Sequence, residues 1–201
     1  MKRMLSVLAL ALAFSMLAGT AQAQRGVRVA IRDKAGREVA VFKESHALII
    51  GVSDYRAGWP KLPGVKSDVV AVKAALESHG FDVEVVEDPT SEQLTRAFSS
   101  FINRHGRKKD TRLVFYYAGH GHTQKMSYGD DMGYIVPVDA PNPNRDPDGF
   151  LAAALDMQQI EVYAKRIQAR HALFLFDSCF SGSIFALSRA VPANISYKTA
   201  L

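Results

Sequence analysis

Three continuous apolar runs mark the core of this sequence, at Ala47 to Val52, Leu113 to Tyr117 and Ala172 to Phe176. Runs of this length without polar alternation are typical of strands buried on both faces. A shorter strand is predicted at Phe81 to Val86. Segments with helical spacing lie between these strands, and such alternation favours parallel crossovers. The pattern predicts an α/β protein with a mostly parallel sheet and helices on both faces.

Polar residues mark the ends of the intervening helices. Ser67 is predicted to cap a first helix that stops at Gly80, since serine caps and glycine ends helices. Thr90 to Gln93 has the spacing of a capping box, and its helix should run to Gly106. Asp156 is predicted to cap a third helix.

The remaining elements are expected to be peripheral. Val27 to Ile31 and Val39 to Phe42 alternate apolar and polar residues, which predicts a small hairpin. Tyr134 to Val136 is expected to form a short strand, and Asp139 to Gly149 reads as a polar loop.

The N-terminus has the pattern of an export signal. Lys2 and Arg3 precede an apolar run from Leu5 to Ala18, and Ala21 to Ala23 has the small-x-small form of a cleavage site. A transmembrane anchor is the competing interpretation, but the run is short for a bilayer span. We therefore expect a signal peptide at 1–23, a hairpin and linker at 24–45, and the main folded domain at 46–201. The mature protein is expected to be soluble and periplasmic or secreted, without a stable membrane anchor.

Charge says little about partners. Removing Lys2 and Arg3 leaves 23 basic and 20 acidic side chains. The densest basic run, Arg104 to Lys109, could contact nucleic acid, but a solvated helix end is the favoured interpretation. We expect no nucleic-acid partner.

Candidate chemistry lies where two of the apolar runs end. Cys179 is the sole cysteine, so no internal disulfide can form, and it follows the third run. His120 follows the second run, between Gly119 and Gly121. Because the carboxyl ends of neighbouring parallel strands open at one edge, these two residues are predicted to form a Cys/His dyad. The amides of Gly121 and Cys179 are the candidate donors to an oxyanion.

Other interpretations of these residues exist. A lone cysteine is often a small buried hydrophobe, but Asp177 and Ser178 indicate that the strand has ended before Cys179. A zinc site from His120, His122, Cys179 and an aspartate fits no established ligand spacing. A serine elbow of the form G-x-S-x-G is absent. The other histidines are expected at the surface or in packing, with His122 nearest the dyad; they are His46, His79, His105, His122 and His171.

The segments Tyr117 to Gly121 and Asp177 to Gly182 resemble the histidine and cysteine motifs of the caspase-like cysteine peptidases, on the metacaspase side. A histidine about 50 residues before the cysteine is a recognised signature of caspases. The resemblance extends over about 46–190 and includes three further blocks, His46 to Tyr55, Leu62 to Ala71 and Gly129 to Ala140. It implies a caspase-like three-layer fold, with Cys179 as nucleophile and His120 as general acid/base.

The resemblance also implies a substrate preference. Metacaspases line the S1 pocket with two aspartates, and the matching residues are Asp68 and Asp177. Two carboxylates favour a cationic side chain, so cleavage after Arg or Lys is expected. The Gln-Ala-Cys of true caspases is absent. Phe180 and Ala118 depart from the pattern, because histidine and serine are common there.

Two further expectations concern ligands and activity. Calcium activates many metacaspases, and the acidic loop residues that could bind it are Asp130, Asp131, Asp146 and Asp148. No cofactor is otherwise required. The expected partner is a peptide or protein substrate, and a catalytically inactive scaffold that binds protein is the alternative.

The end of the chain is the last departure. The family fold completes its sheet with two further strands, whereas residues 183–201 contain no long apolar run. We therefore expect either the large-subunit-like portion of a longer protein, without the last strands, or an incomplete product. A small-subunit-like C-terminal segment is a candidate partner. An unpaired sheet edge and an incomplete cleft would leave 1–201 alone poorly folded or inactive.

Overall fold

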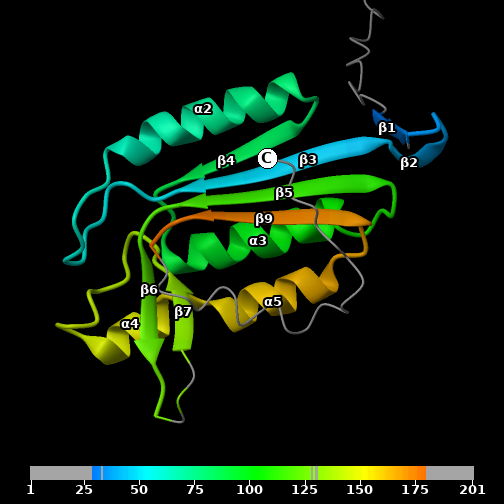
Figure 1. Ribbon diagram of the computed structural model, residues 1–201. Helices are drawn as coiled ribbons and strands as arrows, with labels where there is room; N and C mark the ends of the chain where they lie inside the picture. Colours follow the sequence, from blue (N-terminus) through cyan, green and yellow to red (C-terminus); the bar gives the residue numbers. More distant parts are fainter. Residues whose placement is uncertain (1–28, 33, 128, 130, 180–201) are drawn as a thin grey trace, which may run out of the picture.

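The computed structural model describes residues 29–32, 34–127, 129 and 131–179. The central sheet has four strands, in the order β4 (Asp82–Glu87), β3 (Glu44–Gly51), β5 (Thr111–Ala118) and β9 (His171–Asp177). All three neighbouring pairs are parallel. Their carboxyl ends therefore lie at one edge of the sheet, on the left in Figure 1. The predicted mostly parallel sheet is confirmed.

Helices cover both faces of this sheet, as predicted (Figure 1). Helix α2 (Gly64–Ser78) lies on one face, and α3 (Ser91–His105) and α5 (Met157–Arg166) lie on the other. Because side chains alternate along a strand, adjacent residues serve different cores. Tyr116 packs in the smaller cluster beneath α2, and Tyr117 packs in the larger cluster beneath α3 and α5.

Two of the three predicted helix starts are confirmed. Thr90 and Gln93 form the capping box of α3, and Gly106 caps its C-terminus. Asp156 accepts a hydrogen bond of 2.7 Å from the Gln159 amide and so caps α5. Both caps satisfy amides that otherwise have no partner at a helix start.

The predicted start of α2 is wrong. The helix begins at Gly64 after Pro63 and ends at Ser78, and it has no side-chain cap. Proline fits a helix start because its fixed φ suits the helix and its missing N–H is not needed there. The helix therefore begins about one turn earlier than predicted, and Ser67 and Asp68 lie inside it.

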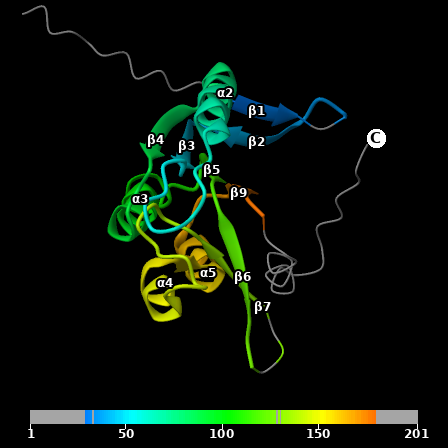
Figure 2. The ribbon, with the colours of Figure 1, turned by 90° about the vertical axis from the view of Figure 1, so that its left-hand side faces the viewer.

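A second, smaller sheet extends from the carboxyl edge (Figure 2). It contains the antiparallel strands β6 (Gly121–Lys125), β7 (Asp131–Ile135) and β8 (Leu155–Asp156). The short strand predicted near Tyr134 is β7. Strand β6 was not predicted, because its sequence is polar and lacks an apolar run.

The segment 139–149, predicted as a polar loop, ends in a helix. Helix α4 spans Pro147–Ala153, and the Asp146 side chain accepts a hydrogen bond of 2.9 Å from the Gly149 amide. Phe150 is buried and anchors this helix to the core. Its single apolar anchor gave too little periodicity to indicate a helix.

The hairpin near the N-terminus is confirmed for the described residues. Strands β1 (Val29–Arg32) and β2 (Glu38–Phe42) pair antiparallel and lead into β3. Phe42 is buried, with its ring centroid 5.0 Å from that of His171. The predicted signal peptide and residues 183–201 lie outside the described residues. Within the described part of the chain, no helix has the length and apolar character to cross a membrane.

Strand β9 differs from the other two apolar runs in its exposure. Among the described residues it pairs with β5 alone. Leu173 and Leu175 are 52% and 43% exposed, whereas Phe174 stacks on Phe115 with ring centroids 4.3 Å apart. The apolar run at 172–176 therefore predicted the strand correctly, but the strand is not buried on both faces among the described residues.

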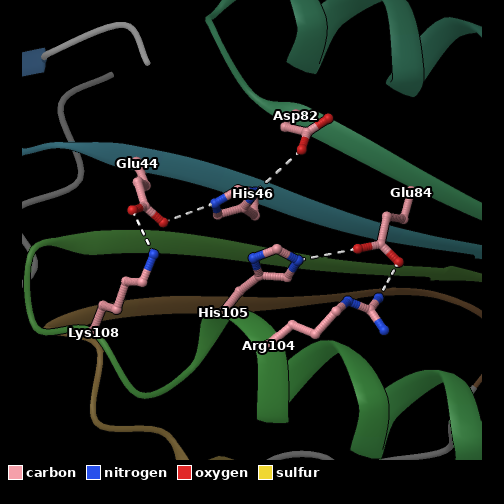
Figure 3. Close-up of polar contacts among 7 residues, drawn as sticks. All are labelled: Glu44, His46, Asp82, Glu84, Arg104, His105 and Lys108. Carbon is pink, nitrogen blue, oxygen red and sulfur yellow. Dashed lines mark hydrogen bonds and ion pairs between the residues drawn. The ribbon is translucent and has the colours of Figure 1, made fainter. Parts of the chain in front are cut away.

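A cluster of ionisable side chains packs at the amino ends of the strands (Figure 3). The rings of His46 and His105 stack with centroids 3.8 Å apart. His46 Nε2 lies 3.2 Å from a Glu44 oxygen, and His105 Nε2 lies 3.1 Å from a Glu84 oxygen. We call this the amino-end cluster: Glu44, His46, Asp82, Glu84, Arg104, His105 and Lys108.

Cations complete the amino-end cluster. Lys108 Nζ lies 2.7 Å from Glu44, and Arg104 pairs with Glu84. Both residues belong to the basic run predicted to be a solvated helix end. Two side chains of this basic run, Arg104 and Lys108, therefore form ion pairs with carboxylates of the same chain.

Candidate active site

His120 and Cys179 follow neighbouring strands at the carboxyl edge of the sheet. The register of β5 and β9 ends with Ala118 opposite Asp177, and each candidate residue lies two positions further along its chain. The Gly119 amide donates a hydrogen bond of 3.3 Å to the Asp177 carbonyl, which extends the pairing toward the site. Cys179 is exposed, as expected for a thiol beyond the strand end. His120 and Cys179 thus lie at the same end of the sheet.

Gly119 is required by space. An added Cβ would lie 2.7 Å from the hydroxyl oxygens of both Tyr55 and Tyr117. Neither Gly119 nor Gly121 has a positive φ. The close approach of two phenols therefore explains Gly119, and neither glycine is needed for a left-handed backbone conformation.

Two buried phenols hold the backbone of His120. Its amide donates a hydrogen bond of 2.6 Å to the Tyr55 hydroxyl. Its carbonyl lies 2.9 Å from the Tyr117 hydroxyl and accepts a bond of 3.2 Å from the Val136 amide. The Tyr117 hydroxyl also accepts a bond of 3.1 Å from that Val136 amide. These contacts fix the backbone position of His120 just beyond the end of β5, and so fix the point from which its imidazole extends.

Burial keeps both phenols protonated. It raises the pKa of Tyr55 to about 12, although hydrogen bonds from Tyr117 and His120 oppose the rise. Burial also raises the pKa of Tyr117 well above its ordinary value, and the neighbouring Tyr55 adds to the rise. Neutral phenols can both donate and accept, so they serve the amide and the carbonyl of His120 together.

The imidazole of His120 is oriented by a backbone carbonyl. Its Nε2 lies 2.9 Å from the Pro60 oxygen, and because a carbonyl only accepts, Nε2 carries the proton. The neutral ring then has its lone pair on Nδ1. The rings of Tyr55 and Trp59 pack around it, with centroids 4.6 and 5.1 Å away. The arrangement leaves one basic nitrogen for proton transfer.

The two predicted S1 carboxylates share a neighbour. Tyr116 donates a hydrogen bond of 3.1 Å from its hydroxyl to Asp177 Oδ2. The pKa of Tyr116 is raised, first by burial, then by Asp177 and also by the charge of Asp68. Asp68 and Asp177 come from α2 and the end of β9, yet both charges act on one phenol. Asp68 is exposed on its helix.

The pairing of β6 with β7 sets the orientation of the Gly121 amide, one of the two candidate donors to an oxyanion. Gly121 lies opposite Ile135 in β6 and β7, next to the position where Val136 bonds to the His120 carbonyl. Because hydrogen-bonded and non-bonded pairs alternate in an antiparallel ladder, the Gly121 amide points away from β7. Cys179 directly follows the bend at Ser178.

Metal ligands do not gather in the described part of the chain. No group of three His, Cys, Asp or Glu side chains that could hold a metal ion occurs there. His122 instead packs its ring edge-on to Phe150, 5.1 Å away, and burial lowers its pKa. Of the calcium candidates, Asp146 caps α4 and Asp130 lies outside the described residues.

The comparisons with known proteins agree with this architecture. The family described as the caspase domain, peptidase family C14, matches residues 44–197. The chain belongs to this family. A crystal structure of a Geobacter sulfurreducens protein superposes with a TM-score of 0.55 over 73% of this chain and 54% of that one, at 18% identity. That likeness supports the caspase-like α/β fold.

Curated relatives include peptidases. Human mucosa-associated lymphoid tissue lymphoma translocation protein 1 is 31% identical over 137 residues, covering 68% of this chain and 15% of that protein. Metacaspase-1 of Mycosarcoma maydis is 30% identical over 156 residues, covering 70% of this chain and 36% of that protein. A probable protease of a Desulfuromonadales bacterium is 29% identical over 159 residues, covering 68% and 18%. The chain therefore spans a minor part of each relative.

Several site residues escaped the sequence analysis. Tyr55, Pro60 and Tyr117 hold His120, and Tyr116 holds Asp177. Tyrosines inside an apolar strand were a weak signal, since a buried phenol needs a hydrogen-bond partner. Pro60 acts through its carbonyl, which every residue has, so its identity gave no signal.

Proposed function

We propose that this protein is a cysteine endopeptidase in which His120 activates Cys179. The observation that supports this most is the orientation of His120, whose Nε2 bonds to the Pro60 carbonyl and whose Nδ1 remains basic. Cys179 lies exposed at the same sheet edge. Membership of a family with peptidase relatives supports the same reaction.

The proposed reaction has two halves. His120 takes the thiol proton, and the Cys179 thiolate attacks the peptide carbonyl carbon. The protonated imidazole then gives its proton to the departing amine as the C–N bond breaks, which leaves a thioester. Water, deprotonated by His120, attacks the thioester and releases the acid and the free thiol. The amides of Gly121 and Cys179 would stabilise the oxyanion in both halves.

We also propose cleavage after Arg or Lys. Tyr116 donates a hydrogen bond to Asp177 and packs against α2, the helix that carries Asp68, which supports placing both carboxylates around one subsite. Two carboxylates there would stabilise a cationic P1 side chain through charge-assisted hydrogen bonds. Activation by calcium, export, and completion by a small-subunit-like segment stay predictions.

A thiol-directed probe on the complete protein, including the C-terminal segment expected from the family resemblance, tests the dyad. We expect Cys179 to react with iodoacetamide faster than a model thiol at neutral pH, and Cys179→Ala to abolish cleavage of Arg or Lys substrates. A Cys179 that reacts like a model thiol, together with cleavage unchanged in Cys179→Ala, would overturn the proposal. Peptide binding without turnover on any library would favour the inactive scaffold.

Substrate series test the pocket. Among fluorogenic peptides with Arg, Lys, Asp or Leu at P1, those with Arg or Lys should be cleaved faster than those with Asp or Leu. A preference for Asp would contradict the role of Asp68 and Asp177 while leaving the dyad intact. Equal activity in chelator and in millimolar calcium would contradict calcium activation.

A further inference from the structure

Tyr116 links the two acidic residues of the proposed S1 pocket. Its ring is buried against α2, in the cluster that contains Val65 and Val69. Its hydroxyl donates a hydrogen bond of 3.1 Å to Asp177 Oδ2. Asp68 lies on the same helix, α2, directly before Val69 in the sequence. One side chain thus contacts both the helix that bears Asp68 and the carboxylate of Asp177.

The bond to Tyr116 restrains Asp177. Asp177 is the last residue of β9 and is exposed, so its carboxylate would otherwise be free to rotate. Among the described residues no ion pair holds Asp177, and its carboxylate accepts a hydrogen bond from the Tyr116 phenol. A neutral donor leaves the negative charge of Asp177 in place. It therefore orients the carboxylate without neutralising it.

Orientation matters differently for the two cationic side chains. A guanidinium is planar and donates through a rigid fork, so it needs carboxylate oxygens held in fixed positions. An ammonium is a compact charge with rotatable donors, and it adapts to a carboxylate that moves. A restrained Asp177 should accordingly benefit arginine more than lysine.

We propose that Tyr116 is a positioning residue that makes this site prefer arginine over lysine at P1, by holding the Asp177 carboxylate in one orientation. This inference rests on the proposed function. Tyr116 does not contact the scissile bond, so its effect should appear in substrate binding. The bond-breaking step at Cys179 should be unaffected.

Tyr116→Phe is the test, because it keeps the ring and removes the hydroxyl. For a P1 Arg peptide we expect KM to rise about 5- to 20-fold with kcat within about twofold, and for a P1 Lys peptide KM to rise less than about threefold. The matched control is Tyr163→Phe, which removes a hydroxyl from a buried tyrosine on the α5 face. It should leave both KM values unchanged.

Binding to the full chain provides a readout independent of turnover. Butylguanidine and butylamine, titrated by NMR, are matched probes of the two head groups. Wild type should bind butylguanidine more tightly, and Tyr116→Phe should lose most of that preference. A wild type that shows no such preference, or a variant that retains it, would overturn the proposal.

A double-mutant cycle places the effect on Asp177. In an Asp177→Asn background, Tyr116→Phe should cause no further change in the Arg-to-Lys ratio of Kd. An equal additional change would show that Tyr116 acts through something else. If the chain binds butylguanidine as expected but cleaves no peptide, the proposed peptidase activity fails, whereas the preference of the Tyr116–Asp177 pair for a guanidinium group is retained.

Discussion

The two ends of the central sheet hold histidines in opposite ways. At the amino end, His46 and His105 stack on each other and point ring nitrogens at Glu44 and Glu84. At the carboxyl end, His120 has a neutral carbonyl as its ring partner and two phenols on its backbone. A carboxylate partner stabilises the cationic ring, whereas a carbonyl fixes a tautomer and leaves a basic nitrogen. The hydrogen-bond partner of the imidazole ring, and not the residue type, therefore distinguishes a histidine used in packing from a candidate general base.

The largest expected contrast is between single substitutions at the two ends. His120→Ala should slow alkylation of Cys179 and lower kcat by about 10²- to 10⁴-fold, as expected for loss of a general base. His46→Ala should leave the alkylation rate within about threefold but lower the free energy of unfolding by about 1–3 kcal/mol. Iodoacetamide kinetics and urea unfolding on both variants measure the contrast. Equal alkylation rates in the two variants would break it.

A second prediction concerns the space around His120. Gly119→Ala places a methyl 2.7 Å from two phenol oxygens, so one phenol must move. We expect a loss of about 1–3 kcal/mol of unfolding free energy, as for overpacked cores, with a lower alkylation rate of Cys179. Gly64→Ala is the control, because nothing lies within 4 Å of the added methyl. The prediction is wrong if both variants unfold at the same urea concentration as wild type.

The smallest expected effect is the pH dependence of stability at the amino end. The pKa of His105 is lowered, first by burial and then by the neighbouring His46, while Glu84 opposes the shift and Arg104 adds to it. The unfolded state therefore binds a proton more readily than the folded state. His105 contributes stability at pH values above its unfolded pKa, and this stability is lost as pH falls through the folded pKa.

Urea midpoints measured between about pH 7.5 and 5.5 test this sign. The midpoint should fall with decreasing pH in wild type, and His105→Asn should flatten the slope. His79→Asn, at an exposed histidine beyond α2, should keep the wild-type slope. Below about pH 4.5 a separate loss is expected, because the bond to Lys108 lowers the pKa of Glu44 in the folded state. A slope retained in His105→Asn would assign the pH dependence to other groups.

Much of the fold was predictable because its signals are local. The runs at 47–52, 113–117 and 172–176 all mark parallel strands. Burial on both faces explains the apolar residues of the first two runs, whereas β9 is partly exposed among the described residues. The caps at Thr90 and Asp156 were predictable because a capping side chain bonds within its own first turn. Strand β6 and helix α4 were not, because tertiary contacts stabilise them against a polar or weakly periodic sequence.

By itself the sequence determined the class of the protein and the identity of its candidate dyad. Cys179 and His120 each follow an apolar run, and motif and topology together put both at one edge. The supporting contacts were decided by the tertiary structure alone. Tyr55 and Pro60 lie 65 and 60 positions from His120, and Tyr116 lies 61 from Asp177. Hydrogen bonds over such separations depend on where whole elements pack, which no local pattern of residues encodes.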